Sequence, residues 1–258
     1  MRITSWNVNG LRTALKKGFA ERLEAIAPDV LLLQEVRALP EQLGDWATPS
    51  GWHVAWHPAE KKGYSGVAIW SRTPLEDLQR GLGPDDPDSE GRVLSAMVQG
   101  IRVTSVYLPS GAAGPHRQAA KDEWLGRFAP WCRDRVDHDV PTVLSGDLNI
   151  AHTPNDIHNP TGNKKNSGFL PHERAWMTQL LEQGWFDALR SHHGERKGPY
   201  TWWSTRGQAR ALDRGWRIDY HLANRALAAR CGAVAIDREA GITISDHAPV
   251  TLEIASAP

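Results

Sequence analysis

The sequence predicts one α/β domain of 258 residues in which strands and helices alternate. Short runs rich in Val, Ile and Leu recur between segments with helical spacing, as expected for buried strands joined by helices. The chain contains no internal repeat, no low-complexity tract and no linker long enough to separate domains. Its length is within the range of one large α/β unit, so we expect a single domain over residues 1–258 with mixed strand connections.

Eight segments are predicted to be strands because each is a short apolar run of the kind that is buried or half-buried in a sheet. They are residues 2–6, 30–33, 67–70, 93–98, 101–106, 142–144, 218–222 and 250–254.

Three segments are predicted to be helices. Apolar residues at helical spacing predict a first helix over 11–26, which a following proline closes. Residues 118–134 predict a second helix, and Pro130 must kink or interrupt it because proline has no backbone N–H. A proline at a first helical position predicts a third helix over 171–184. Residues 81–91, rich in Pro and Asp, predict a surface loop.

Composition excludes several classes of protein. Hydrophobic residues make up 40% of the chain and charged residues 23%, as in a soluble protein with a substantial core. No apolar run approaches the roughly 18 residues of a membrane span, and the N-terminus lacks the pattern of a signal peptide. Cys132 and Cys231 are the only cysteines, which excludes a disulfide framework or a thiolate zinc site. We therefore expect a cytoplasmic protein without a membrane partner, and a monomer.

The net charge of zero gives no support to a nucleic-acid partner, but the charge is unevenly distributed. Residues 161–217 contain ten Lys and Arg and only five Asp and Glu. A basic segment of this kind can hold a polyanion, although an uneven surface without function is the alternative. Twelve Trp against four Phe and four Tyr is also unusual, and either stacking surfaces or the core can account for it.

Polar side chains follow most of the predicted strands. In α/β sheets, side chains at strand ends commonly build a site in the crevice there. One such residue has an ordinary explanation, because strands end at the surface, but six such places together indicate a site. They are Asn7 with Asn9, Gln34 with Glu35, Tyr107, Asp147 with Asn149, Asp219, and Asp246 with His247.

The residue types narrow the chemistry. The carboxylates of Glu35, Asp147, Asp219 and Asp246 are hard oxygen ligands, which suit Mg²⁺ or Mn²⁺ better than zinc. His247 can supply positive charge to a phosphate, with Asp219 or Asp246 orienting it. The phosphate-binding glycine motifs and the nucleophile elbow are absent from the sequence. Metal-assisted attack of water on a phosphate ester is the chemistry that remains.

Nine motifs, in order along essentially the whole chain, resemble the exonuclease III family of apurinic/apyrimidinic (AP) endonucleases. The motifs at 146–149 and 245–247 also occur in the wider superfamily, whereas the motif at 162–169 and the Trp-rich stretch at 200–220 look specific to AP endonucleases. The resemblance implies a four-layered α/β sandwich, in which two packed mixed β-sheets are flanked by helices. The nine motifs are WNVNGLR (6–12), QE (34–35), GYSGV (63–67), EGRV (90–93), YLP (107–109), GDLN (146–149), GNKKNSGF (162–169), GWRIDY (215–220) and SDHAPV (245–250).

The resemblance also implies a Mg²⁺ site, for which Mn²⁺ is a possible substitute. Glu35 is its principal ligand, and Asn7 and Asp246 help to set the site. Asn9 stands where one branch of the family carries Asp, which bears on metal preference. The choice between one metal and two stays open, and the second position would be formed by Asp147, Asn149 and His247.

Five residues are implied to be catalytic. Asp147 prepares the attacking water and Asn149 holds it, while Asp219 pairs with His247, which contacts the scissile phosphate. Tyr107 contacts the phosphate or assists the leaving oxygen.

The DNA-binding candidates follow from charge and from the family pattern. Trp203 and Trp216 resemble the apolar walls of a pocket for an extruded abasic sugar, and Ser167 is small enough for such a pocket. Ser110 replaces the amide that often follows the Tyr-x-Pro motif. Solvated surface charge is the alternative for each basic residue, and the phosphate candidates are Arg12, Arg37, Asn163, Lys164, Asn166 and Arg206.

The predicted function is a Mg²⁺-dependent DNA repair nuclease that cleaves the phosphodiester 5′ to abasic sites in double-stranded DNA. The resemblance adds 3′→5′ exonuclease and 3′-phosphatase or phosphodiesterase activity, in base excision repair, with abasic or 3′-blocked duplexes as partners. One alternative is a phosphatase or phosphodiesterase of the same superfamily that acts on inositol phosphates or lipids. Another is a DNA-binding protein that has lost catalysis, against which the intact set of polar residues argues.

Overall fold

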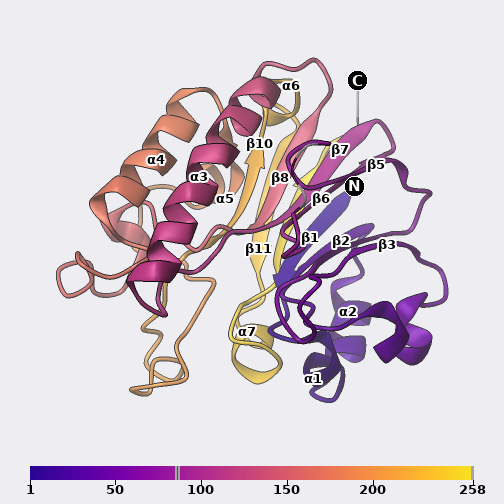
Figure 1. Ribbon diagram of the computed structural model, residues 1–258, viewed down its shortest axis with the longest axis horizontal. Helices are drawn as coiled ribbons and strands as arrows, with labels where there is room; N and C mark the ends of the chain where they lie inside the picture. Colours follow the sequence, from indigo (N-terminus) through magenta and orange to yellow (C-terminus); the bar gives the residue numbers. More distant parts are fainter. Residues whose placement is uncertain (85, 87, 257–258) are drawn as a thin grey trace.

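The computed structural model describes residues 1–84, 86 and 88–256, which form two six-stranded sheets packed face to face with helices outside (Figure 1). The first sheet has the order β11 (Cys231–Ile236), β12 (Val250–Ile254), β1 (Arg2–Asn7), β2 (Val30–Gln34), β4 (Val67–Ser71) and β3 (His53–His57). The second has the order β5 (Glu76–Arg80), β6 (Val93–Val98), β7 (Ile101–Tyr107), β8 (Thr142–Asp147), β10 (Asp219–Ala223) and β9 (Phe186–Asp187).

Each sheet contains one parallel pair of strands. β1 lies parallel to β2, and β7 lies parallel to β8, whereas the other pairs of named strands are antiparallel. Carboxyl ends of parallel strands share one edge of a sheet. The polar residues that end or follow these four strands therefore meet at one edge of the sandwich.

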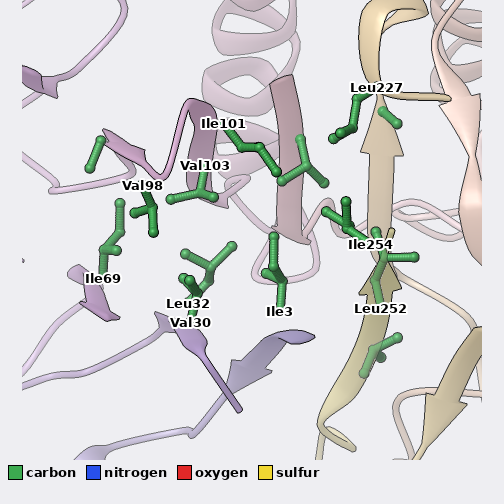
Figure 2. Close-up of a cluster of buried hydrophobic side chains, with 14 of the residues drawn as sticks. Ile3, Val30, Leu32, Ile69, Val98, Ile101, Val103, Leu227, Leu252 and Ile254 are labelled. Atoms are coloured by element: carbon green, nitrogen blue, oxygen red, sulfur yellow. The ribbon is translucent and has the colours of Figure 1, made fainter. Parts of the chain in front are cut away.

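The core between the sheets consists of aliphatic side chains from alternate strand positions, as Figure 2 shows. Ile3 and Leu32 of the first sheet and Val103 of the second point into this layer and are fully buried. Successive side chains of a strand point to opposite faces of the sheet. Trp6 and Leu33, on the other face of β1 and β2, therefore pack against the outer helices.

The helices form the outer layers. α1 (Leu11–Leu15) and α2 (Phe19–Ile26) cover the first sheet, and α3 (Pro115–Val136) and α4 (Pro171–Glu182) cover the second (Figure 1). The predicted four-layered sandwich is confirmed. Shorter helices complete the described chain: η1 (Pro40–Gln42), η2 (Gly44–Ala47), η3 (Pro154–Asp156), α5 (Ala188–His193), α6 (Arg225–Ala228) and α7 (Ala240–Thr243). No helix among the described residues is long and apolar enough to span a membrane.

One helix prediction needs correction. The helix predicted over 11–26 is two helices, because Gly18 adopts a left-handed φ of 95° between α1 and α2. The helix predicted over 118–134 is present as α3, which continues through Pro130 without interruption, and Phe128 and Trp131 on either side of it pack in the same buried cluster. Of the predicted loop at 81–91, residues 85 and 87 lie outside the described chain, and the remainder forms turns and bends.

All eight predicted strands are present, and β3, β5, β9 and β11 were missed. β5 has no buried residue and therefore shows no alternation of apolar and polar side chains. β9 is only two residues long.

Candidate active site

A cavity of about 790 Å³ opens at the edge of the sandwich where β2, β7 and β8 end. Asn7 and Asp219 are buried below its surface. Arg12, Asn163, Lys164 and Trp203 are not among the residues that line it. Ten of the predicted site residues do line it: Glu35, Arg37, Tyr107, Asp147, Asn149, Asn166, Arg206, Trp216, Asp246 and His247.

Asn7, at the end of β1, holds the two carboxylates of the cavity floor. Its side-chain Nδ2 donates to Glu35 Oε1 and to Asp147 Oδ2, both at 3.0 Å. Its Oδ1 accepts the backbone N–H of Asn9 at 3.0 Å. Asn7 thus orients Glu35 and Asp147 from beneath, and Arg37 forms an ion pair with the other oxygen of Glu35.

His247 is held by Asp219, as the sequence predicted. Its Nδ1 lies 3.0 Å from Asp219 Oδ2, and its Nε2 lies 3.7 Å from Asp147 Oδ2. Burial disfavours the imidazolium, but Asp219 and Asp147 outweigh burial and raise the pKa of His247 to about 10. His247 is therefore a buried cation at neutral pH, and the backbone N–H of Asp219 is fixed in turn by the Thr201 hydroxyl at 3.1 Å.

Asp147, the last residue of β8, is the centre of the cluster. Burial, together with the negative charges of Asp219 and Glu35, raises the pKa of Asp147 to about 7, although His247 acts in the opposite direction. Asn149 stays beside it because its backbone N–H and its Nδ2 both donate to Asp147, at 2.8 and 3.2 Å. A carboxylate with a pKa near neutrality and a fixed amide neighbour is suited to proton transfer with a water molecule.

Tyr107 ends β7 and keeps its proton. Burial, and then the charges of Glu35 and Asp147, raise the pKa of Tyr107 well above its usual value. The buried guanidinium of Arg92 lies 4.9 Å from the centre of the Tyr107 ring and donates to its backbone carbonyl at 2.9 Å. The phenol is therefore a hydrogen-bond donor at the cavity surface.

Asp246 also lines the cavity and has its own hydrogen-bond partners. Its two oxygens accept from Asn9 Nδ2 at 2.8 Å and from Trp202 Nε1 at 3.1 Å. Burial would raise the pKa of Asp246, but His247 and these hydrogen bonds lower it, so the carboxylate is charged.

The two carboxylates of the cavity floor, Glu35 and Asp147, fit a hard divalent cation, whereas protonated His247 has no lone pair for a metal. Among the described residues, Glu35, Asp147 and His247 form a buried group whose ligand atoms lie within 4.8 Å of one another. Carboxylate and amide oxygens are the ligands that Mg²⁺ and Mn²⁺ prefer. Of the residues predicted for the first metal position, only Glu35 belongs to this group, and Asp147 and His247 were predicted for the second position. Asn7 directs its amide nitrogen to the carboxylates, and Asp246 is bound to Asn9 and Trp202.

The structure corrects one wall of the predicted abasic-sugar pocket. Trp203 is 1% exposed, packs with Tyr200 and Ala248, and donates its Nε1 to Asp213 at 2.8 Å, so it belongs to the core. Its neighbour Trp202 lines the cavity instead, at 6.0 Å and nearly perpendicular to the Trp216 ring. The two residues are adjacent in an irregular segment, and sequence alone carried no signal of which one faces inward.

Three predicted phosphate contacts lie outside the cavity. Arg12 belongs to a separate hollow beside α1, and Asn163 to a basic hollow with Lys197 and Arg214. Lys164 is exposed, whereas the next residue, Lys165, lines the cavity and was not predicted.

Two packed sheets bring acidic side chains together at their strand ends, beside a histidine that is hydrogen-bonded to a carboxylate. This is the architecture of a metal-dependent hydrolase of phosphate esters. The chain belongs to the Endonuclease/Exonuclease/phosphatase family, whose model matches residues 4–247. The predicted family is thereby confirmed.

The relatives narrow the class to nucleases. The chain is 36% identical over 255 residues to an exodeoxyribonuclease of Bacillus subtilis, covering 98% of this chain and 99% of the relative. It is 38% identical over 259 residues to the DNA repair nuclease APEX1 of Danio rerio, covering 99% and 82%.

Two solved structures support the same class of protein. A 3′ phosphatase, NExo from Neisseria, solved with a product DNA hairpin, matches with a TM-score of 0.89 at 36% identity, over 99% of this chain and 100% of that chain. An AP endonuclease from Archaeoglobus fulgidus matches with a TM-score of 0.89 at 30% identity, over 99% and 100%. The predicted enzyme class, a hydrolase of the DNA repair nucleases, is confirmed.

Proposed function

We propose that this protein is a Mg²⁺-dependent nuclease that cleaves the phosphodiester 5′ to abasic sites in double-stranded DNA. On the same site we propose 3′→5′ exonuclease and 3′-phosphatase or phosphodiesterase activity, by a cytoplasmic monomer that forms one domain over residues 1–258. The observation that carries the proposal is the placement of Asp147 between the His247 cation and the Asn149 amide, in a cavity walled by two tryptophans.

Glu35 and Asp147 are the residues that would hold the metal ion, and Asn7 keeps their oxygens converging. When bound, the ion supplies positive charge that polarises the phosphate and neutralises the charge that develops on its oxygens. The ion pair between Arg37 and Glu35 supports this proposal, because it identifies Glu35 as a carboxylate with a cationic partner.

The chain's own residues then have distinct roles. His247, kept protonated by Asp219, donates its Nε2–H to a phosphate oxygen, and Tyr107 donates from another side. Asp147 takes a proton from the attacking water, which Asn149 holds. Because Nε2 of His247 is 3.7 Å from Asp147, the phosphate-binding group and the base face the same reacting centre.

Selectivity for abasic sites follows from the cavity wall. An abasic nucleotide has no base to stack or pair, so its extrusion from the duplex costs less than that of an intact nucleotide. Trp202 and Trp216 meet edge to face at the wall, where they can receive a bare sugar and exclude a nucleotide that retains its base. Lys165 and Arg206 at the same cavity supply positive charge for the flanking phosphates.

The decisive experiment uses a duplex with a single abasic analogue, incubated with and without Mg²⁺. We expect incision 5′ to the analogue only with the metal, whereas an inositol phosphate or a phospholipid should not be hydrolysed. The Glu35→Ala variant should need more Mg²⁺ and recover part of its activity at high Mg²⁺, because one ligand is lost while Asp147 remains. Hydrolysis of inositol phosphates in preference to the duplex would refute the proposal, as would duplex binding without any incision.

A further inference from the structure

Lys121 of α3 and Glu173 of α4 form an ion pair that is fully buried, with both side chains 0% exposed. Lys121 Nζ lies 2.6 Å from Glu173 Oε1. The two helices pack side by side over the second sheet (Figure 1). A buried pair of charges is costly to desolvate and is retained only where its geometry is well satisfied, so the other partners of this pair indicate what it does.

Lys121 also binds the catalytic loop. Its ammonium group donates to the backbone carbonyl of Asn149 at 2.9 Å. Asn149 has a left-handed φ of 49°, a conformation that is uncommon outside glycine and that Asn adopts more readily than most residues. The hydrogen bonds to Asp147 fix the amide side of Asn149, and Lys121 fixes its carbonyl side.

Glu173 holds the neighbouring segment of the cavity wall, which contains Gly168. Its Oε2 accepts the backbone N–H of Gly168 at 2.7 Å and that of Leu170 at 3.0 Å. Gly168 lies so close to Asn149 and Trp216 that a Cβ on it would stand 3.1 Å from the Asn149 carbonyl oxygen and from the Trp216 ring. The Gly168 carbonyl also accepts from the backbone N–H of Ala151 at 2.8 Å.

We propose that Lys121 and Glu173 are positioning residues, which lock the Asn149 loop and the Gly168–Trp216 wall into one rigid unit. Neither residue touches the cavity surface, so both act through the backbone of others. This inference rests on the proposed function, because its consequence concerns catalysis. The pair sets the distance between the Asn149 amide, which holds the attacking water, and the cavity wall that receives the abasic sugar.

A pair that only stabilised the helices would behave differently. Replacing a buried ion pair by neutral groups of similar volume is often neutral for stability. The loss of a positioning pair instead lowers turnover in a protein that remains folded, because a small misplacement of a catalytic group can cost on the order of 10²-fold in rate.

The test compares Lys121→Met, the double variant Lys121→Met with Glu173→Gln, and a control. The double variant removes both charges and keeps a side-chain oxygen that can accept from the backbone N–H groups of Gly168 and Leu170. It therefore tests the proposal even if the single variant does not fold. The control is Leu180→Ala in the same helix as Glu173, whose side chain packs in the outer core and takes no part in the hydrogen bonds that join the two loops. Each protein is measured for kcat and KM on abasic duplex, for thermal unfolding, and for hydrogen exchange of the Ala151 amide.

We expect kcat of the pair variants to fall by on the order of 10- to 100-fold, with KM and Mg²⁺ dependence close to parental and with faster exchange at Ala151. Leu180→Ala should lower the melting temperature and leave kcat intact below it. Folded pair variants with parental kcat and parental Ala151 exchange would overturn the inference. If the parent itself does not cut abasic duplex, the proposed function fails, and the exchange measurement still decides whether the pair holds the two loops together.

Discussion

Asp147 is a buried acid whose environment makes it a base at neutral pH. It is 1% exposed, and its pKa is raised to about 7 by burial and by neighbouring carboxylates. Asp147→Asn preserves the shape of the side chain but removes the proton acceptor. Turnover on abasic duplex should fall by roughly 10² to 10⁴, while affinity for DNA should hold or rise because a negative charge beside the phosphate is lost. Single-turnover rates and equilibrium binding on one preparation check both, and near-parental turnover would remove Asp147 from the role of base.

The three tryptophans at residues 202, 203 and 216 should separate into two groups. Trp202→Ala and Trp216→Ala should each raise the barrier for abasic cleavage by on the order of 1–3 kcal/mol and relax the preference for abasic over intact DNA. Trp203→Ala removes a core side chain and should instead lower stability by about 3–5 kcal/mol. Abasic cleavage, 3′-exonuclease rate and melting temperature on the three variants distinguish these effects. An unchanged abasic-to-intact ratio in folded Trp216→Ala would exclude that residue from the pocket.

The sequence predicted the polar residues of the site better than its walls. Asn7, Asp147 and Tyr107 are the last residues of buried strands, and strand patterning places such residues without knowledge of the loops. Trp202 and Trp203 lie in a segment with no regular period, where orientation depends on tertiary contacts such as the Trp203–Asp213 hydrogen bond. Lys121 was missed because a lysine in a helix ordinarily indicates a solvated face.

At the scale of elements, the site depends on the close approach of β7 and β8. Gly146 pairs with Val106 in their parallel ladder and has a φ of 149°. A Cβ on Gly146 would stand 1.9 Å from the carbonyl oxygen of Val106, which no side chain tolerates. The glycine of the Gly-Asp-Leu-Asn motif therefore lets the strand that carries Asp147 lie against the strand that carries Tyr107.

Gly146→Ala should consequently separate these strands. We expect a loss of stability larger than the roughly 1–3 kcal/mol typical of overpacking, since the clash is with backbone. The cleavage rate should fall even well below the melting temperature, because Asp147 and Tyr107 move apart. Gly126→Ala is the matched control, since a Cβ there meets nothing within 4 Å. Chemical denaturation and cleavage assays on both variants test this, and equal behaviour of the two would contradict it.

The elements that sequence reasoning missed share a physical cause. Strands can be predicted from apolar runs where nearly every residue is buried, as in β6 and β7, but not at the edge of a sheet, where β5 is exposed on every residue. The break between α1 and α2 was missed because apolar spacing continues across Gly18, and only its left-handed backbone ends the first helix.

At the scale of the whole molecule, a polar layer lies between the two sheets directly behind the site. Gln34 links Ser5 to Ser105 at 3.3 and 3.0 Å, and His221 accepts from the Ser145 hydroxyl at 2.7 Å. Nε2 of His221 donates to the Val250 carbonyl at 2.9 Å, so this histidine bridges the second sheet to the first in its neutral form. Hydrogen bonding of each buried group is what makes such a layer tolerable in a core.

This layer should make the fold sensitive to acid. Burial lowers the pKa of His221 to about 4 from its ordinary 6.5. Between these pH values the unfolded chain binds a proton that the folded chain does not, so the free energy of unfolding falls as pH decreases from 6.5 to 4, by on the order of 3 kcal/mol. The pKa of Asp147 is raised from 3.8 to about 7, so Asp147 acts in the opposite direction across the whole of this window, and the parental curve alone does not isolate the effect of His221. His221→Gln can keep both hydrogen bonds without titrating, and denaturant unfolding at a series of pH values should show a smaller loss toward pH 4 in this variant than in the parent. Parallel pH curves for the two proteins would show that His221 does not carry the acid sensitivity.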